Sequence, residues 1–244
     1  MKIFAFIPSR YGSSRFPGKP LALIAGKPMI QHVYERTVSC PEILGTYVAT
    51  DDERIADCVK GFGGNAVMTD RSHRSGTDRI CEAAKKIGLE GDDIVVNIQG
   101  DQPVFDHIIV TRLVKPLLED ETIPMSTLKW KMRDREDVSN PNHVKVVTDR
   151  KDFAIYFSRY AIPYTRDGEK GHEFFKHLGF YAYRMDFLLK YTNLPEGVLE
   201  SAEKLEQLRA LEHGFRIKVV ETEYNSIEVD VKEDIRKVEE FLEG

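Results

Sequence analysis

A loop rich in glycine, serine and cations follows the first apolar segment of the chain, and this composition suits a polyphosphate. Residues 8–20 read PSRYGSSRFPGKP and contain three cations and no acid. Backbone N–H groups at glycines, serine hydroxyls and cationic side chains are the donors that bind phosphate oxygens. The cationic and serine side chains next to these glycines are Arg10, Ser13, Ser14, Arg15 and Lys19. A Walker loop is excluded, because it has four residues between its glycines and five separate Gly12 from Gly18. The alternative is a solvated surface loop.

Two aspartates stand in contexts that suit a hard cation. Residues 95–103, VVNIQGDQP, run from an apolar segment into Gly100 and Asp101, and residues 227–231, IEVDV, place Asp230 among apolar residues. Mg²⁺ usually takes one or two protein carboxylates and completes its shell with phosphate oxygens and water. Each aspartate could instead cap the helix that follows it, and the sequence leaves both interpretations open.

Other polar segments permit a binding role but also have simpler explanations. Residues 71–79, RSHRSGTDR, place serine, glycine and threonine at an expected helix start among three arginines. This segment can bind an anion or a base edge, or Ser75 or Thr77 can simply cap the helix. Five further polar side chains interrupt apolar patterns: Arg159, His177, Tyr181, Glu206 and Gln207. From the residues alone we interpret these five as structural, because charged helix residues usually face solvent and a lone histidine is usually a satisfied core residue.

The first half of the chain alternates apolar runs with amphipathic stretches. We expect strands at residues 3–7, 47–50, 66–68 and 93–98. We expect helices at residues 28–40, 51–59, 75–87 and 106–118. Strands of continuous isoleucine and valine between helices are typical of a parallel sheet that is covered on both faces. The polar loops then lie at the carboxyl ends of strands, where such sheets bind ligands.

The rhythm changes after residue 124, where strands follow one another with little helix between them. We expect strands at residues 125–132, 144–148, 154–157 and 178–183, and an exposed loop at 165–174. We expect helices at residues 185–192, 200–212 and 231–242. The pattern predicts a mixed-sheet lobe over residues 125–225, inserted into an α/β domain made of residues 1–124 and 226–244.

Composition excludes several classes of protein. The 244 residues are 41% hydrophobic and 31% charged, which is enough apolar material for a large core. The longest apolar run has five residues, so the sequence predicts no membrane insertion and no secretion signal. A net charge of −5 argues against a nucleic-acid partner. Three cysteines without metal-site spacing fit a reducing cytoplasm.

Seven motifs together resemble one enzyme family, the 3-deoxy-manno-octulosonate (Kdo) cytidylyltransferases. The resemblance runs from end to end, through IPSRYGSSRFPGKPL, VATDD, HRSGTDR, NIQGDQP, FSRYAIPY, HLGFYAYR and SAEKLEQLRALEHGFRIKV. The opening loop is also similar to that of sialic acid cytidylyltransferases, whereas the combination of HRSGTDR, QGDxP and LEQLR is typical of the Kdo enzymes. One departure is Gln102, which stands where the family has an acid.

The resemblance implies a fold, a reaction and partners. The expected fold is α/β, with a Rossmann-like, mostly parallel sheet that binds nucleotide and an inserted mixed-sheet lobe, as in nucleotide-diphospho-sugar transferases. The expected reaction transfers CMP from CTP to the anomeric hydroxyl of Kdo, with Mg²⁺ as cofactor and release of pyrophosphate, for lipopolysaccharide biosynthesis. The expected form is a cytoplasmic homodimer whose lobe, residues 125–225, binds the sugar and makes the dimer contact.

The resemblance also implies roles for individual residues, and it replaces the structural interpretation of the five polar residues in the lobe. The expected catalytic residues are Arg10, Lys19 and Asp101. The expected CTP-binding residues are Arg10, Ser13, Ser14, Arg15, Lys19, Arg74, Ser75, Asp78, Gln99 and Gly100. The expected Kdo-binding residues are Arg159, His177, Tyr181, Glu206 and Gln207. The expected metal ligands are Asp101 and Asp230. Two alternatives remain, namely a cytidylyltransferase for another acidic sugar such as 8-amino Kdo and a nucleotide-binding subunit without catalysis.

Overall fold

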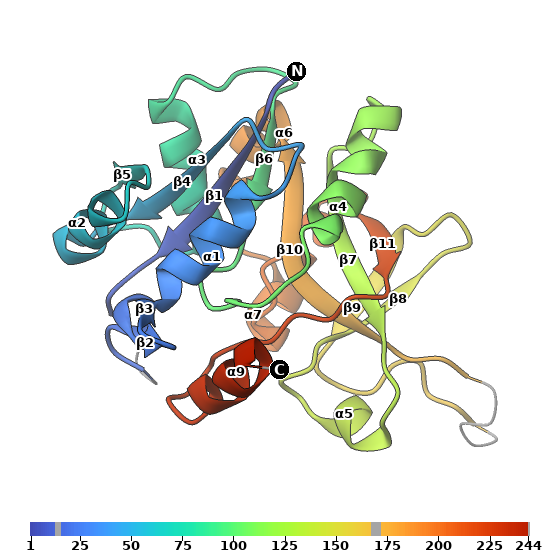
Figure 1. The fold of residues 1–244 in the computed structure, drawn as a ribbon. Helices are drawn as coiled ribbons and strands as arrows, with labels where there is room; N and C mark the ends of the chain where they lie inside the picture. Colours follow the sequence, from blue (N-terminus) through green and yellow to red (C-terminus); the bar gives the residue numbers. More distant parts are fainter. Residues whose placement is uncertain (13–15, 167–171, 244) are drawn as a thin grey trace.

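A twisted central sheet of nine strands organises the computed structural model, which describes residues 1–12, 16–166 and 172–243. Along the main path the strand order is β11-β7-β10-β6-β1-β4-β5 (Figure 1). The strands of the first half are β1 Ile3–Ser9, β4 Gly45–Thr50, β5 Ala66–Met68 and β6 Ile94–Asn97. These four strands are parallel, as their runs of isoleucine and valine predicted.

Helices cover both faces of this sheet because its strands are apolar on both sides. Along β1, Ala5 and Ile7 face one core cluster and Phe6 faces the other. Helices α1, α2 and α4 pack on the first face, and α3 and α6 pack on the second (Figure 1). The bounds of these helices are α1 Met29–Val38, α2 Glu53–Gly61, α3 Gly76–Lys86, α4 Ile108–Glu119 and α6 Met185–Tyr191. Asp52 caps α2, since its carboxylate accepts the Arg54 N–H at 3.0 Å.

The second half of the chain continues the same sheet. Its strands are β7 Met125–Lys131, β8 Lys145–Thr148, β9 Ala154–Ser158, β10 Phe175–Arg184 and β11 Lys218–Thr222. Strand β10 runs antiparallel to both β6 and β7, and β8 and β9 branch from it as an antiparallel pair. The mixed α/β fold with a mostly parallel sheet is therefore confirmed. The division into two lobes stays a prediction. Strands β7, β10 and β11, which belong to the expected second lobe, are part of the same nine-stranded sheet as β1, β4, β5 and β6.

The structure differs from the sequence prediction in the last third of the chain. The expected helix at residues 200–212 is wrong, because two short helices replace it: α7 Val198–Glu203 and α8 Leu208–Glu212. Lys204 between them has φ of 53°, a left-handed conformation that ends an α-helix. We also missed β11, whose sequence KVVET packs along the edge of β7. Short elements that we did not predict are η1 Lys19–Leu21, β2 Leu23–Ile24, β3 Lys27–Pro28 and α5 Arg135–Ser139.

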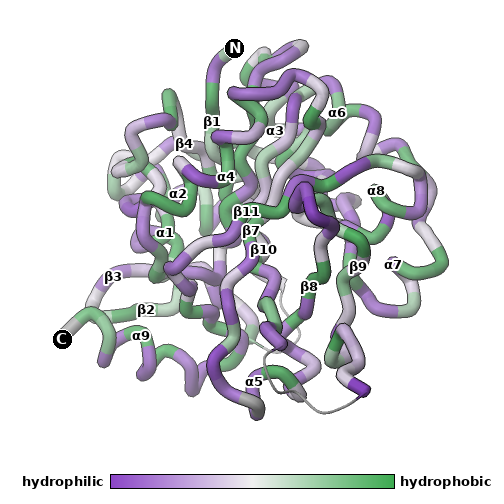
Figure 2. The backbone as a smooth tube through the Cα atoms, turned by 90° about the vertical axis from the view of Figure 1, so that its right-hand side faces the viewer, coloured by the Kyte–Doolittle hydropathy of each residue, from purple (hydrophilic) through white to green (hydrophobic). Residues whose placement is uncertain are grey.

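The last helix, α9 Asp234–Glu243, lies near the polar loop of residues 8–20, because Phe16 of that loop packs against the same cluster as its Val238. It alternates hydrophobic and hydrophilic residues (Figure 2), and its Val238 is buried against Ile24, Met29 and Val104. The chain between β11 and α9 runs past the end of β6, where Val229 N–H donates to the Asp101 carbonyl oxygen at 2.9 Å. Among the described residues, no helix is long and apolar enough to cross a membrane.

Candidate active site

A cavity of about 380 Å³ opens at the carboxyl ends of β1 and β6. These strands are adjacent and parallel, so the loops that follow them meet at the same edge of the sheet. The residues that line the cavity are Pro8, Ser9, Arg10, Lys19, Pro20, His73, Arg74, Ser75, Gly76, Arg79, Gln99, Gly100, Asp101 and Glu206. The structure therefore brings together eight residues that the sequence analysis singled out: Arg10, Lys19, Arg74, Ser75, Gln99, Gly100, Asp101 and Glu206.

The floor of the cavity requires glycine at position 100. A Cβ atom there would lie 2.9 Å from the Pro8 carbonyl oxygen and 3.1 Å from Ser9 Oγ, closer than side chains normally approach. Gln99 beside it donates from Nε2 to the Gly179 carbonyl oxygen at 2.8 Å. Gly179 lies where the register of β10 against β7 shifts. This contact ties the floor of the cavity to the second half of the sheet.

Lys19 and Asp101 form an ion pair across the cavity. Lys19 Nζ lies 2.8 Å from Asp101 Oδ2 and donates to the Val229 carbonyl oxygen at 2.9 Å. The helix after Asp101 begins at Ile108, with His107 as its N-terminal flanking residue, so Asp101 does not cap it. Of the two interpretations that the sequence left open for Asp101, the structure excludes capping.

Asp230 follows Val229 on the segment that crosses Asp101. In the turn before α9, the Asp234 carboxylate accepts the Asp230 and Val231 N–H groups at 3.0 and 3.1 Å. Because Val229 N–H is bonded to the Asp101 carbonyl oxygen, the segments that carry Asp101 and Asp230 lie side by side. Asp101 lines the cavity, whereas Asp230 is not among the described residues that line it and is placed near it only through this neighbouring segment.

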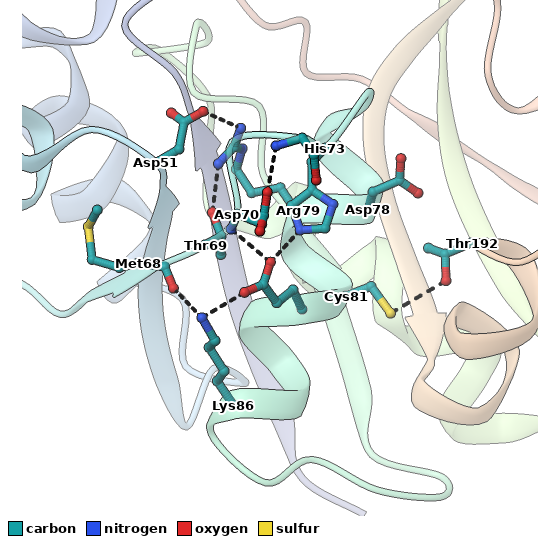
Figure 3. A network of polar contacts seen from close by, with 12 residues as sticks. Asp51, Met68, Thr69, Asp70, His73, Asp78, Arg79, Cys81, Lys86 and Thr192 are labelled. Carbon is teal, nitrogen blue, oxygen red and sulfur yellow. Dashed lines mark hydrogen bonds and ion pairs between the residues drawn. The ribbon is translucent and has the colours of Figure 1, made fainter.

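The segment before α3 has both roles that the sequence left open. Ser75 caps α3, because its hydroxyl accepts the Asp78 N–H at 3.1 Å, and the same hydroxyl lies 3.3 Å from Glu206 Oε1. The segment is anchored by Arg79, which is buried and donates to Thr69 Oγ1 at 2.6 Å and Asp51 Oδ2 at 2.9 Å (Figure 3). Serine capping and cavity lining are therefore compatible.

A contact between His73 Nε2 and the Glu82 carboxylate holds the other end of this segment (Figure 3). Glu82 also accepts the Asp70 N–H at 2.9 Å and pairs with Lys86. Burial raises the pKa of Glu82, but these hydrogen bonds and charges outweigh it and lower that pKa to about 2. Glu82 therefore stays ionised and keeps the loop in place beside the cavity.

A larger cavity of about 1150 Å³ adjoins the first and shares His73, Arg74, Ser75 and Glu206 with it. Asp78, which we predicted on the nucleotide side, lines this second cavity. Glu206 stands at the junction, and Thr77 Oγ1 donates to its Oε2 at 3.1 Å. Burial raises the pKa of Glu206 to about 7, although Thr77 and Arg209 act in the opposite direction. This carboxyl group can therefore change its protonation state near neutral pH.

Three predicted sugar-binding residues are buried beside this junction. His177 is buried against Phe157 and Tyr181, and burial lowers its pKa to about 3, so its imidazole is neutral. Its Nε2 contacts Thr127 Oγ1 at 2.9 Å. Burial also raises the pKa of Tyr181 far above its usual value, which keeps the phenol protonated. Gln207 is buried, and its Nε2 finds no hydrogen-bond partner within the described part of the chain.

Arg159 lies apart from these residues. Its guanidinium donates to three backbone carbonyl oxygens, those of Glu203 at 2.7 Å, Pro141 at 3.1 Å and Lys204 at 3.4 Å. Like His177, Tyr181 and Gln207, it is not among the described residues that line either cavity. The structure does not describe three of the predicted CTP-binding residues. These are Ser13, Ser14 and Arg15 of the polar loop at residues 8–20.

Some cavity residues had no individual role assigned from sequence. Ser9 and Arg79 line the smaller cavity, and both lie within the polar segments 8–20 and 71–79. Ser9 also ends β1, so its position at a strand end was the available signal. The hydrogen bond that Thr77 makes with Glu206 joins residues 129 positions apart, and no local pattern indicates such a contact.

Comparisons with known proteins agree with the geometry. The family model described as cytidylyltransferase matches residues 4–221. The 3-deoxy-manno-octulosonate cytidylyltransferase of Desulfatibacillum aliphaticivorans is 54% identical over 242 residues, which cover 99% of each chain. That of Syntrophus aciditrophicus is 53% identical over 243 residues, which cover 100% of this chain and 98% of the relative.

Solved structures extend the comparison. A structure of CMP:2-keto-3-deoxy-manno-octonic acid synthetase complexed with CTP matches with a TM-score of 0.93 and 42% identity, covering 100% of this chain and 99% of that chain. The 4-diphosphocytidyl-2C-methyl-D-erythritol synthase of Anaerococcus prevotii, 16% identical with a TM-score of 0.65, shares the fold; the match covers 100% of this chain and 96% of that one. About half of the residues are identical to those of the Desulfatibacillum and Syntrophus relatives over the whole length of the chain. The chain therefore belongs to the 3-deoxy-manno-octulosonate cytidylyltransferase family.

Proposed function

We propose that this protein transfers CMP from CTP to the anomeric hydroxyl of Kdo, releases pyrophosphate, and so supplies an activated sugar for lipopolysaccharide biosynthesis. Family membership over the full chain supports the reaction. The observation that carries it is the cavity at the ends of β1 and β6, where cations, a glycine floor and Asp101 stand next to a buried carboxyl, Glu206. Such a site can hold a triphosphate on one side and a sugar hydroxyl on the other.

Arg10 and Lys19 are proposed to bind the triphosphate, because both line the cavity directly after β1. Positive charge at this point stabilises the negative charge that develops on the leaving pyrophosphate. We expect Ser13, Ser14 and Arg15 of the same loop to add contacts. The proposed neighbours of the nucleotide are Arg74, Ser75, Asp78, Gln99 and Gly100.

The donor set at the cavity edge fits Mg²⁺. Asp101 and Asp230 are carboxylates on segments that a hydrogen bond holds side by side, and Mg²⁺ usually takes one or two carboxylates with phosphate oxygens. These two residues would hold the ion, which when bound would polarise the triphosphate oxygens. The Asp101 carboxylate is paired with the Lys19 ammonium group, as expected for a carboxylate that attracts a cation.

The sugar is proposed to enter beside Glu206, Gln207, His177 and Tyr181. Neutral His177 and protonated Tyr181 can hydrogen-bond hydroxyl groups without adding charge. Gln207 Nε2, which has no partner among the described residues, can donate to a hydroxyl or carboxylate oxygen. With the hydroxyl held in line with the α-phosphorus, the reaction becomes effectively unimolecular. Arg159 remains the proposed partner of the Kdo carboxylate, and reaching it requires Arg159 to leave the backbone carbonyls that it now binds.

We also propose that the protein acts as a cytoplasmic homodimer through residues 125–225. Exposed aromatic and aliphatic side chains in this lobe support the proposal, including Ile155, Tyr160, Tyr164 and Val198. Sedimentation of the purified protein measures its mass in solution, and a monomer at micromolar concentration would contradict the dimer.

The decisive experiment measures pyrophosphate release from CTP and Mg²⁺ with Kdo, 8-amino Kdo, sialic acid or no sugar. We expect release that depends on Kdo and is absent with sialic acid. Faster release with 8-amino Kdo would move the assignment to that analogue. Binding of CTP without release for any sugar would contradict the enzymatic function and favour a nucleotide-binding subunit.

A further inference from the structure

Lys19 stands where the two proposed metal-binding segments meet. Its Nζ lies 2.8 Å from Asp101 Oδ2 and 2.9 Å from the Val229 carbonyl oxygen. Val229 immediately precedes Asp230, and its own N–H donates to the Asp101 carbonyl oxygen at 2.9 Å. One ammonium group therefore binds oxygen atoms from both segments at once.

The backbone around Lys19 keeps the ammonium at this position. Gly18 has φ of 72°, and its N–H donates to the Tyr11 carbonyl oxygen at 2.9 Å. Pro20 is buried directly after Lys19. The Lys19 side chain is 14% exposed and that of Asp101 is 34% exposed, so water screens the pair less than it screens a surface pair.

The oxygens that Lys19 occupies are of the kind that a hard divalent cation binds. Carboxylates and backbone carbonyls are typical ligands of Ca²⁺ and Mg²⁺. A divalent ion and an ammonium group cannot bind the same carboxylate oxygen at close range without strong repulsion. Metal binding at Asp101 Oδ2 and the Val229 carbonyl oxygen thus requires Lys19 to move away, and the lysine needs other oxygen atoms to move to.

We propose that Lys19 is an internal substitute cation, which occupies Asp101 and the Val229 carbonyl until a triphosphate draws it away, so that metal binding depends on nucleotide binding. The proposal rests on the proposed function, because it takes CTP as the triphosphate and Asp101 as a metal ligand. Lys19 thereby has a positioning role in the free protein in addition to contacting CTP in the complex. It also neutralises Asp101 while the site has no nucleotide.

Thermodynamic coupling makes this proposal measurable. Displacing Lys19 requires free energy, so the protein binds the metal less tightly in the absence of nucleotide. Bound nucleotide removes this requirement, because it draws Lys19 away from Asp101. Replacing Lys19 with an uncharged side chain removes the competitor, so metal alone should then bind more tightly. A purely structural lysine would have the opposite effect or none.

The test measures Mn²⁺ binding without nucleotide by electron paramagnetic resonance of the free ion. We expect Lys19→Met to bind Mn²⁺ about tenfold or more tightly than the wild type, as for the loss of one charge-assisted hydrogen bond. Lys19→Arg keeps the cation and should retain the weak wild-type binding. Lys27→Met is the matched control, because it removes the same charge from an exposed pair with Glu35.

Two measurements separate this proposal from the proposed function. Equal Mn²⁺ affinity in wild type and Lys19→Met, including no detectable binding by either, would overturn the proposal, as would weaker binding by Lys19→Met with its thermal unfolding unchanged. If Lys19→Met unfolds at a lower temperature, Lys19→Gln replaces it in the same comparison and is judged by the same outcomes. Pyrophosphate release by the wild type tests the reaction independently, so either idea can fail while the other stands.

Discussion

Glu206 offers a quantitative test of how burial controls charge at the junction of the two cavities. Burial raises its pKa from 4.5 to about 7, with added repulsion from Asp78 and Glu200, while Thr77 and Arg209 oppose the rise. The folded protein therefore prefers the protonated carboxyl more than the unfolded chain does. The folded state loses stability as the pH rises above 4.5, and the loss is complete above about pH 7.

The size of this loss follows from the pKa difference. One pKa unit corresponds to about 1.4 kcal/mol, so the full loss is about 3 kcal/mol, of which about 2 kcal/mol develops between pH 5 and pH 8. Glu206→Gln removes the titration. Its stability relative to the wild type should therefore improve by about 2 kcal/mol between these pH values, whatever constant cost the altered hydrogen bonds to Ser75 and Thr77 add.

Urea unfolding of both proteins at pH 5 and pH 8 measures this difference, because other titrating groups are common to the two chains. Glu212→Gln is the matched control. Backbone hydrogen bonds from α7 lower the pKa of Glu212, so the ionised carboxylate stabilises the fold and this effect is lost only as the pH falls below the ordinary pKa of a glutamate. The free energy of unfolding of Glu212→Gln should therefore differ from that of the wild type by the same amount at pH 5 and at pH 8. If the free energies of unfolding of Glu206→Gln and the wild type also differed by the same amount at both pH values, the reasoning would be refuted.

Three further predictions concern the floor, the support and the sugar side of the site. Gly100→Ala should destabilise the fold by about 1–3 kcal/mol and weaken CTP binding, because the added Cβ would lie 2.9 Å from the Pro8 carbonyl oxygen. Gly61→Ala is the control, because a Cβ at Gly61 meets open space, and equal unfolding temperatures for the two variants would contradict this prediction. Glu200→Gln should cost about 3 kcal/mol in urea unfolding, because it removes the charge that pairs with the largely buried Arg209 and replaces one of two acceptor oxygens, now at 2.6 and 2.8 Å, with an NH2 donor. A loss no larger than that of Glu240→Gln, whose Arg236 partner is exposed, would rule this out. Arg159→Ala should raise the KM for Kdo far more than that for CTP in pyrophosphate-release assays, and the reverse pattern would move Arg159 to the nucleotide side.

Local patterns in the sequence were sufficient for most of the elements and for the nucleotide half of the site. Strand β1 and the polar loop after it could be predicted, because apolar runs and the residue types of a loop depend on near neighbours. The position of Asp101 at the end of β6 was also local information. The one long helix that we expected at residues 200–212 was wrong, because Lys204 is left-handed. The carbonyl groups of Glu203 and Lys204 at this break accept hydrogen bonds from Arg159, a long-range contact that no local pattern indicates.

The sugar half of the site could be assigned only through resemblance to a family. A histidine or glutamate within an apolar pattern has the same local signature whether it is structural or binds a ligand. His177 is neutral because Phe157 and Tyr181 surround it, and these contacts exist only after β9 and β10 pack together. The hydrogen bonds that Glu206 accepts likewise come from Ser75 and Thr77 at the start of α3, which is distant in sequence.

The amino-acid sequence by itself determined the α/β alternation, the cationic loop and the settings of Asp101 and Asp230 after apolar runs, because each depends on residue type and short spacing. Only the tertiary structure decided which of these groups meet. Lys19 reaches Asp101 across 82 positions and Val229 across 210, and the parallel pairing of β1 with β6 makes the first contact possible. Long-range contacts of this kind arise from burial of the whole sheet, which no local segment encodes.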